Sequence, residues 1–202
     1  MSEDVDSWQP LSPDDVREVL AGVPTPWWIA GGWAIDLFLG ERTREHGDMD
    51  ILILRKDRLA IQSHLSDWDL HKSQQPGLKP WPHGEYLLPP VTDIWCRYDS
   101  SSPWSMEFML METEGERWVY RRQPKIRGPL SALGAQTDKG LPYIHPEIQL
   151  LYKAKPETLE NDEHDFDLVL PRLSRDPRQW LHDALSIQFP HGHEWIERLK
   201  AT

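Results

Sequence analysis

Residues 27–54 read WWIAGGWAIDLFLGERTREHGDMDILIL, and this stretch decides the fold. Its first four residues are apolar and precede two glycines, which predicts a short buried strand that ends in a tight turn. Residues 33–39 are mostly apolar and stop at Gly40, which predicts a short helix. After a polar loop, residues 48–54 predict a second strand. The stretch therefore predicts a strand, a glycine turn, a helix, a loop and a strand, in that order.

Two aspartates open the second of these strands. Side chains alternate along a strand, so Asp48 and Asp50 are expected on one face and Met49 and Ile51 on the other, apolar face. Carboxylates that lie close repel each other unless solvent or a cation relieves them. The pair is therefore either solvated or a ligand of a divalent cation. The charged loop before it favours a cation such as Mg²⁺, which binds one or two carboxylates together with substrate phosphates.

A third carboxylate is expected from a neighbouring strand. Glu107 lies within the apolar strand predicted at residues 106–111, and charged residues are seldom buried without a partner. Glu107 therefore either faces solvent or acts as a metal ligand or general base. Asp93 is the competitor, although its position at the beginning of another predicted strand favours an ordinary turn role.

Gly31 and Gly32 have two interpretations. Taken alone, they form a tight turn between a strand and a helix. In this position they also allow a ligand to approach the backbone closely, and the amides that open the following helix suit phosphate oxygens. No Gly-Lys-Ser/Thr sequence follows, so the turn is not a P-loop.

These residues together resemble a known motif. It consists of Gly31-Gly32-Trp33-Ala34-Ile35-Asp36, Gly40, Thr43-Arg44, His46 and Asp48-Met49-Asp50. The combination resembles the antibiotic nucleotidyltransferases of the DNA polymerase beta superfamily, in particular the aminoglycoside 2″-adenylyltransferase-like family and its lincosamide-modifying relatives. The resemblance implies that the Gly31-Gly32 turn and the Trp33 amide bind the triphosphate of a nucleotide, which we expect to be ATP. It also implies Asp48 and Asp50 as Mg²⁺ ligands, with a third acid as metal ligand or base.

Two positions depart from the superfamily pattern. Gly32 stands where many members have Ser, although the 2″-adenylyltransferase branch also has Gly-Gly. The third acid is Asp in many members and is Glu107 here, which is one methylene longer. We predict Asp48, Asp50 and Glu107 as the catalytic and metal-binding residues.

Arg44 and His46 precede the aspartates in the charged loop. Arg44 suits a phosphate because its guanidinium is a planar fork, and His46 suits a carboxylate or the nucleotide. The alternative is a surface ion pair with Glu41 or Glu45. We predict both residues at the nucleotide and leave this alternative open.

Three further features have a plain structural interpretation and a functional one. Lys153 ends a predicted helix, where a cation meets the negative end of the helix dipole, but it is also a candidate for the triphosphate. Asp36 is expected to be an exposed helix acid, with bracing of the metal loop as the alternative. Residues 160–165 are expected to be a solvated helix start. Trp81 and Trp104 are candidates for stacking on an adenine or a sugar.

The rest of the chain predicts an α+β fold, in which a mixed β-sheet is flanked by helices. Further strands are predicted at 68–70, 86–88, 94–98, 106–111 and 118–121, and further helices at 13–20, 57–65, 146–155, 162–170 and 177–187. We divide the chain into a nucleotidyltransferase core, residues 1–128, and a C-terminal helical lobe, residues 129–202, that packs on the core.

The composition excludes several classes of protein. The chain has 22 basic and 33 acidic residues and a formal net charge of −11, which argues against a nucleic-acid binder and favours a polycationic partner. No window approaches the roughly 20 apolar residues of a membrane span, and the first residues lack the basic start of a signal peptide. The single Cys96 suits a reducing cytosol, so a cytoplasmic protein is expected.

We therefore predict a Mg²⁺-dependent nucleotidyltransferase that moves AMP from ATP to a hydroxyl group of a small molecule, most favourably an aminoglycoside-type antibiotic. A lincosamide, a protein or a tRNA is the alternative acceptor. A catalytically silent nucleotide-binding module with the same fold is the alternative from another class.

Overall fold

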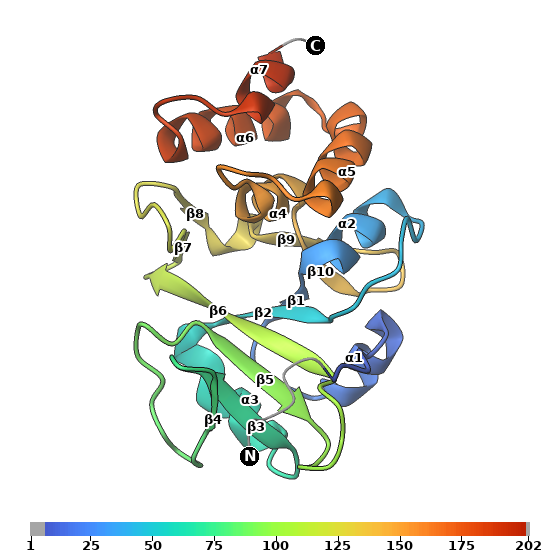
Figure 1. The fold of residues 1–202 in the computed structure, drawn as a ribbon, viewed down its shortest axis with the longest axis vertical. Helices are drawn as coiled ribbons and strands as arrows, with labels where there is room; N and C mark the ends of the chain where they lie inside the picture. Colours follow the sequence, from blue (N-terminus) through green and yellow to red (C-terminus); the bar gives the residue numbers. More distant parts are fainter. Residues whose placement is uncertain (1–6, 201–202) are drawn as a thin grey trace.

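The computed structural model describes residues 7–200, which form a mixed sheet flanked by helices (Figure 1). The helices are α1 (Pro13–Val19), α2 (Gly31–Leu39), α3 (Arg58–His64), α4 (Pro146–Lys153), α5 (Glu160–Val169), α6 (Arg175–Gln188) and α7 (Glu194–Lys200). The strands are β1 (Trp27–Ile29), β2 (Asp50–Leu54), β3 (Asp69–Ser73), β4 (Leu78–Pro80), β5 (Asp93–Arg97), β6 (Met106–Glu114), β7 (Arg117–Val119), β8 (Arg127–Pro129), β9 (Gly134–Gln136) and β10 (Pro142–Ile144).

The sheet order is β4-β3-β5-β6-β2-β1-β10-β9, and β7 and β8 extend the far end of β6. β2 pairs with β6, and β1 with β10, in parallel, whereas the other neighbours are antiparallel. This confirms the predicted α+β class with a mixed sheet. β9 and β10 lie beyond residue 128, so the sheet takes strands from both sides of the boundary that we propose between core and lobe.

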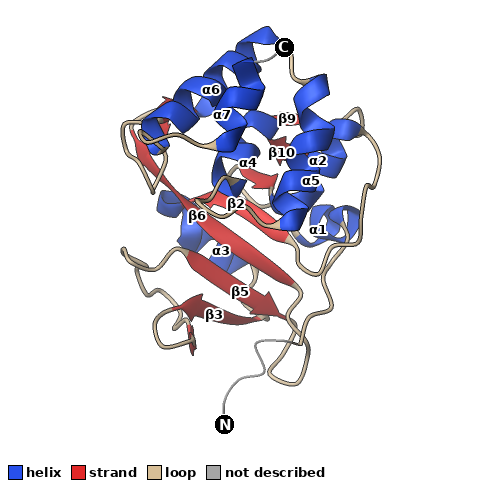
Figure 2. Cartoon of the chain, turned by 45° about the horizontal axis from the view of Figure 1, so that its top comes forward, coloured by secondary structure: helices blue, strands red, loops and turns tan. Residues whose placement is uncertain are grey.

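Two hydrophobic cores cover the two faces of the sheet. Ile51 and Phe108 face the core that contains α1 and α3. Leu52 and Met111 face the core built with α4, α5, α6 and α7. The four C-terminal helices gather over one end of the sheet, whereas β3 and β5 have α3 behind them and no helix in front (Figure 2). The second face of β5 and of the start of β6 is therefore not covered by a helix.

α1 begins as the sequence predicts. The Asp15 amide donates to Ser12 Oγ over 3.2 Å, and the Ser12 amide donates to Asp15 Oδ2 over 2.9 Å. This reciprocal capping box satisfies amides that have no partner within the helix. Pro13 occupies the first helical position.

Two predictions about the elements are wrong, and five elements were not predicted. Gly31 and Gly32 are the first residues of α2 rather than a turn before it. Residues 86–88 form no strand, and Tyr86 and Leu88 are each 65% exposed, because the prolines around them leave no regular neighbour to pair with. The strands β4, β8, β9 and β10 were not predicted, because three residues show little periodicity, and the helix α7 was also not predicted. None of the described helices is long and apolar enough to cross a bilayer.

Candidate active site

Asp50 and Glu107 lie side by side at the start of two parallel strands. They are register partners in β2 and β6. The backbone fixes this position, because the Glu107 amide donates to the Met49 carbonyl and the Ala30 amide to the Asp50 carbonyl, each over 2.8 Å. The next residue in each strand, Ile51 or Phe108, is fully buried on the opposite face. Both carboxylates are therefore on the face that the helical lobe only partly covers.

Burial and neighbouring acids disfavour the charged form of both carboxylates. Burial, and then the nearby Asp48 carboxylate, raises the pKa of Asp50 to about 7, while Lys153 acts in the opposite direction. Burial, then Asp50 and Asp93, raises the pKa of Glu107 to about 9. Such crowded carboxylates are the arrangement that a divalent cation relieves.

Four acidic residues lie in this region, but they do not form a compact group of metal ligands. Asp48 is exposed just before β2, and its charge reaches both Asp50 and Glu107. Asp93 is on β5, accepts a hydrogen bond from Thr92 and lies 3.6 Å from Arg121. Within residues 7–200, no three acidic, histidine or cysteine side chains converge closely enough to form a metal site. The identity of the third carboxylate therefore stays a prediction, although Asp93 has a basic partner.

Gly31 brings the start of α2 against Asp50. Its φ is +63°, which favours glycine, and a Cβ atom here would overlap the Asp50 carboxylate. Its amide donates to Gln149 Oε1 of α4 over 2.9 Å. Gly32 is equally constrained, because a Cβ atom would overlap Arg44 and lie 2.6 Å from the His46 ring.

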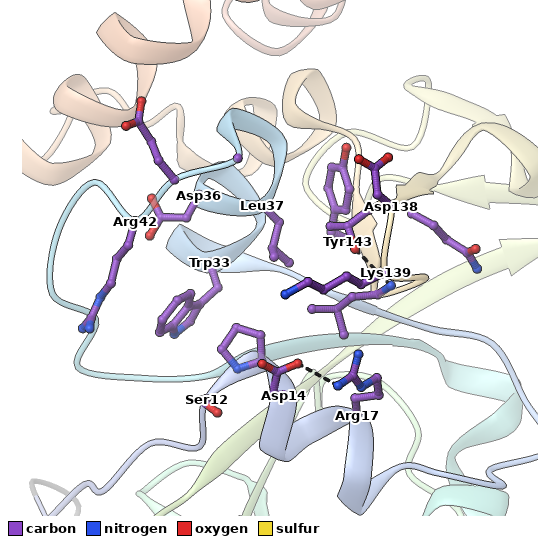
Figure 3. A pocket seen from close by; sticks show the side chains of 16 residues that line it. Ser12, Asp14, Arg17, Trp33, Asp36, Leu37, Arg42, Asp138, Lys139 and Tyr143 are labelled. Atoms are coloured by element: carbon purple, nitrogen blue, oxygen red, sulfur yellow. Dashed lines mark hydrogen bonds and ion pairs between the residues drawn. The ribbon is translucent and has the colours of Figure 1, made fainter.

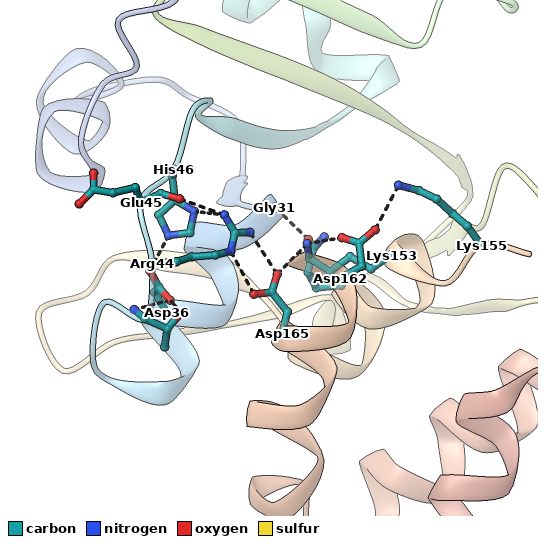
Figure 4. A network of polar contacts seen from close by, with 11 residues as sticks. Gly31, Asp36, Arg44, Glu45, His46, Lys153, Lys155, Asp162 and Asp165 are labelled. Atoms are coloured by element: carbon teal, nitrogen blue, oxygen red, sulfur yellow. Dashed lines mark hydrogen bonds and ion pairs between the residues drawn. The ribbon is translucent and has the colours of Figure 1, made fainter. Parts of the chain in front are cut away.

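Arg44 joins the loop before β2 to the helical lobe. Its guanidinium makes two contacts with the Asp165 carboxylate of α5, at 3.3 and 3.2 Å, and a third with His46 Nδ1 at 3.1 Å (Figure 4). Asp165 is fully buried. The alternative of a surface ion pair with Glu41 or Glu45 is wrong for Arg44, since it pairs with Asp165 and contacts Glu45 at the backbone carbonyl.

His46 and Asp36 hold the same loop against α2. His46 Nε2 lies 2.5 Å from Asp36 Oδ2, and the Thr43 hydroxyl donates to Asp36 Oδ1 over 2.6 Å. The His46 ring also packs on Trp33, with centroids 4.4 Å apart. Asp36 is only 4% exposed, so our expectation of an exposed helix acid is wrong. It braces the loop instead.

Lys153 is paired with carboxylates of α5. Its ammonium lies 2.9 Å from Asp162 and 2.8 Å from Asp165, and Lys155 lies 3.1 Å from Asp162. Burial alone would lower the pKa of Lys153, but these two carboxylates raise it above its ordinary value. The expected solvated helix start at residues 160–165 is therefore wrong for Asp162 and Asp165, which are buried.

Two residues that lie near the acids, Gln149 and Trp95, were not predicted, and two tryptophans that were predicted to stack on a ligand are buried. Gln149 and Trp95 were not singled out, because one lies in an amphipathic helix and the other in an apolar strand. Trp95 is the register partner of Glu107 on β5. Trp81 and Trp104 are 5% and 0% exposed, so neither offers a free ring face for stacking.

A large hollow lies elsewhere on the molecule. It has a volume of about 620 Å³ and lies between α1, α2 and the loop joining β9 and β10 (Figure 3). Trp33 and Asp36 are in its wall, but Asp48, Asp50 and Glu107 are not among its lining residues. The hollow is therefore separate from the acids, and we place the active site at the acids because the motif is there.

Comparison with known proteins finds a family match over the part of the chain that carries the motif. Residues 14–75 match the aminoglycoside-2″-adenylyltransferase family model, and this range contains Gly31, Gly32, Asp48 and Asp50. This stretch of the chain is similar to that family. The resemblance seen in the motif is thereby confirmed.

The chain is also similar to known proteins over longer stretches. It is 22% identical over 153 residues to a lincosamide resistance protein of Staphylococcus haemolyticus, which covers 75% of this chain and 88% of that protein. A lincosamide antibiotic adenylyltransferase, solved with lincomycin bound, superposes with a TM-score of 0.54 at 16% identity, over 77% of this chain and 92% of that one. A nucleotidyltransferase-like protein of Paracoccidioides brasiliensis gives 0.50 at 17% identity, over 96% of each chain. The two structures show that the fold is shared.

Proposed function

We propose that this nucleotidyltransferase transfers AMP from ATP to a hydroxyl group of an amino-sugar antibiotic, with Mg²⁺ as cofactor. The observation that carries the proposal is the pairing of Asp50 with Glu107 against the Gly31 backbone. Carboxylates and a glycine-opened helix are what phosphoryl transfer needs, because its catalysis is mainly positioning and charge neutralisation.

The donor atoms at this site fit Mg²⁺. Asp48, Asp50 and Glu107 would hold it, since all three offer hard oxygen ligands and the raised pKa values of Asp50 and Glu107 reflect charge that a cation would relieve. When bound, Mg²⁺ supplies positive charge to the phosphate oxygens and favours the ionised form of the carboxylates. We keep Glu107 as the third acid because Asp93 already faces Arg121.

The nucleotide would lie against the start of α2. The Gly32 and Trp33 amides there suit the terminal phosphates, and the tight approach of Gly31 to Asp50 puts those amides beside the metal ligands. Arg44 and Lys153 converge on Asp165 close to Gly31 (Figure 4). Both cations are thus held next to the proposed triphosphate, with His46 orienting Arg44.

The transfer itself needs no covalent intermediate. The acceptor hydroxyl oxygen attacks the α-phosphorus and forms the new P–O bond, while the bond from that phosphorus to the bridging oxygen breaks and pyrophosphate leaves. Ionised Glu107 accepts the hydroxyl proton. The products are the adenylylated acceptor and pyrophosphate.

The acceptor class follows from charge and from the comparisons. The net charge is −11, and acids lie on the open face, the face of β5 and of the start of β6 that no helix covers. Both attract a cationic amino sugar, which favours an aminoglycoside. Similarity to a lincosamide resistance protein specifically favours a lincosamide as the second candidate. Because ATP is the proposed donor, we also place the reaction in the cytoplasm.

Incubation with Mg²⁺, ATP and a panel of both antibiotic classes, followed by mass spectrometry, tests the proposal. The expected product has gained one AMP, pyrophosphate appears in equal amount, and EDTA abolishes both. ATP binding without any product across the panel would instead identify the silent nucleotide-binding module.

A further inference from the structure

The open face of the sheet continues beyond the catalytic acids. Across the strands, Asp50 of β2, Glu107 of β6 and Trp95 of β5 form one row of register partners. Residues directly opposite in a sheet share a face, so all three side chains are on the same side. Ile94 and Cys96, the neighbours of Trp95 in β5, are fully buried on the other side. Trp95 therefore stands next to Glu107 on the face that no helix covers at β5 (Figure 2).

The order of the strands separates the two substrates. The start of α2, where the triphosphate is proposed, follows β1, and the sheet then runs through β2 and β6 to β5. In phosphoryl transfer the attacking and leaving oxygens lie roughly in line on opposite sides of the phosphorus. Pyrophosphate leaving on the α2 side therefore requires the acceptor on the Glu107 and Trp95 side. Neighbouring strands are about 4.8 Å apart, so a ring attached to the reacting hydroxyl would lie over Trp95.

Trp95 is held in place by other aromatic side chains. Its ring meets Trp8 edge-on with centroids 4.8 Å apart and Trp104 at 5.5 Å. The segment before α1 is fixed here by backbone hydrogen bonds, in which the Gln9 amide donates to the Trp104 carbonyl. Trp95 itself stays half-buried, whereas Trp104 is fully buried. Of these two neighbouring residues, Trp95 is thus the one with an exposed part that a ligand could contact.

Trp95 also acts on Glu107 directly. Trp95 is the register partner of Glu107, and its side chain lowers the pKa of the Glu107 carboxyl, against the larger effect of burial. An indole N–H is a donor only, so it favours the ionised form of Glu107, whose oxygens accept. The same side chain therefore offers an apolar ring and a donor that orients the proposed base.

We propose that Trp95 is the acceptor-binding residue of this nucleotidyltransferase, stacking on a saturated hydroxyl-bearing ring that carries an ammonium group, and that its indole N–H positions Glu107. The inference rests on the proposed function and deepens it. The apolar C–H face of such a ring packs on indole, an ammonium is attracted to the ring face, and Glu107 and Asp93 on the same face add negative charge.

Kinetics of two substitutions test this role, with tobramycin and lincomycin as the probes. We expect Trp95→Ala to raise the acceptor KM about tenfold, the effect of losing one aromatic contact and its ammonium attraction, and to leave the Kd of Mg-ATP unchanged. We expect Trp95→Phe, which keeps a ring but has no N–H, to hold the acceptor KM within about threefold and to lower kcat, because Glu107 is no longer oriented. Tyr98→Ala is the matched control, since Tyr98 is an exposed aromatic just past β5, and it should match the wild type.

Each outcome decides the matter. An unchanged acceptor KM in Trp95→Ala, with Mg-ATP binding and transfer intact, overturns the inference and leaves the proposed function standing. If Trp95→Ala does not fold, an unchanged kcat in Trp95→Phe overturns the positioning role. If the wild type transfers AMP to no amino-sugar compound at all, the proposed function fails and the inference with it.

Discussion

Asp50 and Glu107 lie directly opposite each other where the parallel strands β2 and β6 begin. Parallel neighbours bring the same ends of two strands together, so two acids far apart in the sequence share one small area of the sheet. Burial raises the pKa of both acids, Asp48 raises that of Asp50 further, and Asp50 raises that of Glu107 further. The effect of this arrangement on stability and its proposed role in catalysis are both testable.

Asp50→Asn should abolish transfer while the protein stays folded. The amide keeps the size of the carboxylate but loses the charge that binds Mg²⁺, so we expect kcat to fall at least about 100-fold and Mg-ATP to bind more weakly. Pyrophosphate release and calorimetric titration with Mg-ATP measure the two effects. Asp138→Asn, an exposed carboxylate outside the site, should behave like the wild type. Wild-type turnover in Asp50→Asn would refute the assignment.

Glu107→Gln should stabilise the metal-free protein at high pH. The folded-state pKa of about 9 is above the ordinary value of 4.5, so the folded state prefers the protonated acid. Stability from this group is therefore present below about pH 4.5 and is lost as pH rises toward 9. We expect the variant to be more stable than the wild type by about 1–3 kcal/mol at pH 8, a Tm rise of several degrees, since solvent reaches part of the side chain.

Thermal melts in EDTA at pH 4 and pH 8 provide the measurement. The two proteins should melt together at pH 4, where both carry a neutral side chain at this position. A Tm difference that is the same at both pH values would show that packing, and not ionisation, separates them.

Asp165→Asn should destabilise the protein strongly. The buried Asp165 carboxylate faces both Arg44 and Lys153, and removing one partner of a buried pair leaves uncompensated charge that costs about 3–5 kcal/mol. Urea unfolding measures the loss. Asp167→Asn, on the same helix, removes an exposed partner of Arg198 and should cost less than about 1 kcal/mol. Equal costs in the two variants would contradict the bridging role of Asp165.

Gly31→Ala should impair both folding and nucleotide binding. At φ +63° an alanine is strained by roughly 1–2 kcal/mol, and its Cβ atom would overlap the Asp50 carboxylate. We expect a lower Tm and Mg-ATP affinity reduced at least about tenfold. Gly47→Ala is the control, since a Cβ atom there meets nothing within 4 Å and φ is ordinary. Mg-ATP binding that is equal in the two variants would remove Gly31 from the site.

Much of the fold could be predicted where the sequence patterns that indicate an element extend over only a few residues. The alternation from Met49 to Ile53 correctly places Asp50 opposite an apolar face, and Ser12 with Pro13 correctly starts α1. The helices α4, α5 and α6 were found from apolar residues at helical spacing, with ends within a few residues. The short strands β4, β8, β9 and β10 were missed because three residues show little period, and the helix α7 was missed as well.

The site was predicted in part for the same reason. The motif indicates Gly31, Gly32, Arg44, His46 and Asp50, and the structure brings these residues together. It could not indicate that Asp36 is buried against His46, because an acid in a helix looks the same whether it faces solvent or a loop that folds back on it.

By itself the sequence determined the strand–helix–strand unit, the face on which Asp50 lies and the family that the unit resembles, since these depend on spacing over a few residues. Only the tertiary structure decided that Trp95 stands beside Glu107, and that Arg44 meets Asp165, 121 positions away. Strand order and helix docking set those neighbours. They arise from burial of two large cores, which is non-directional and leaves no short-range pattern in the chain.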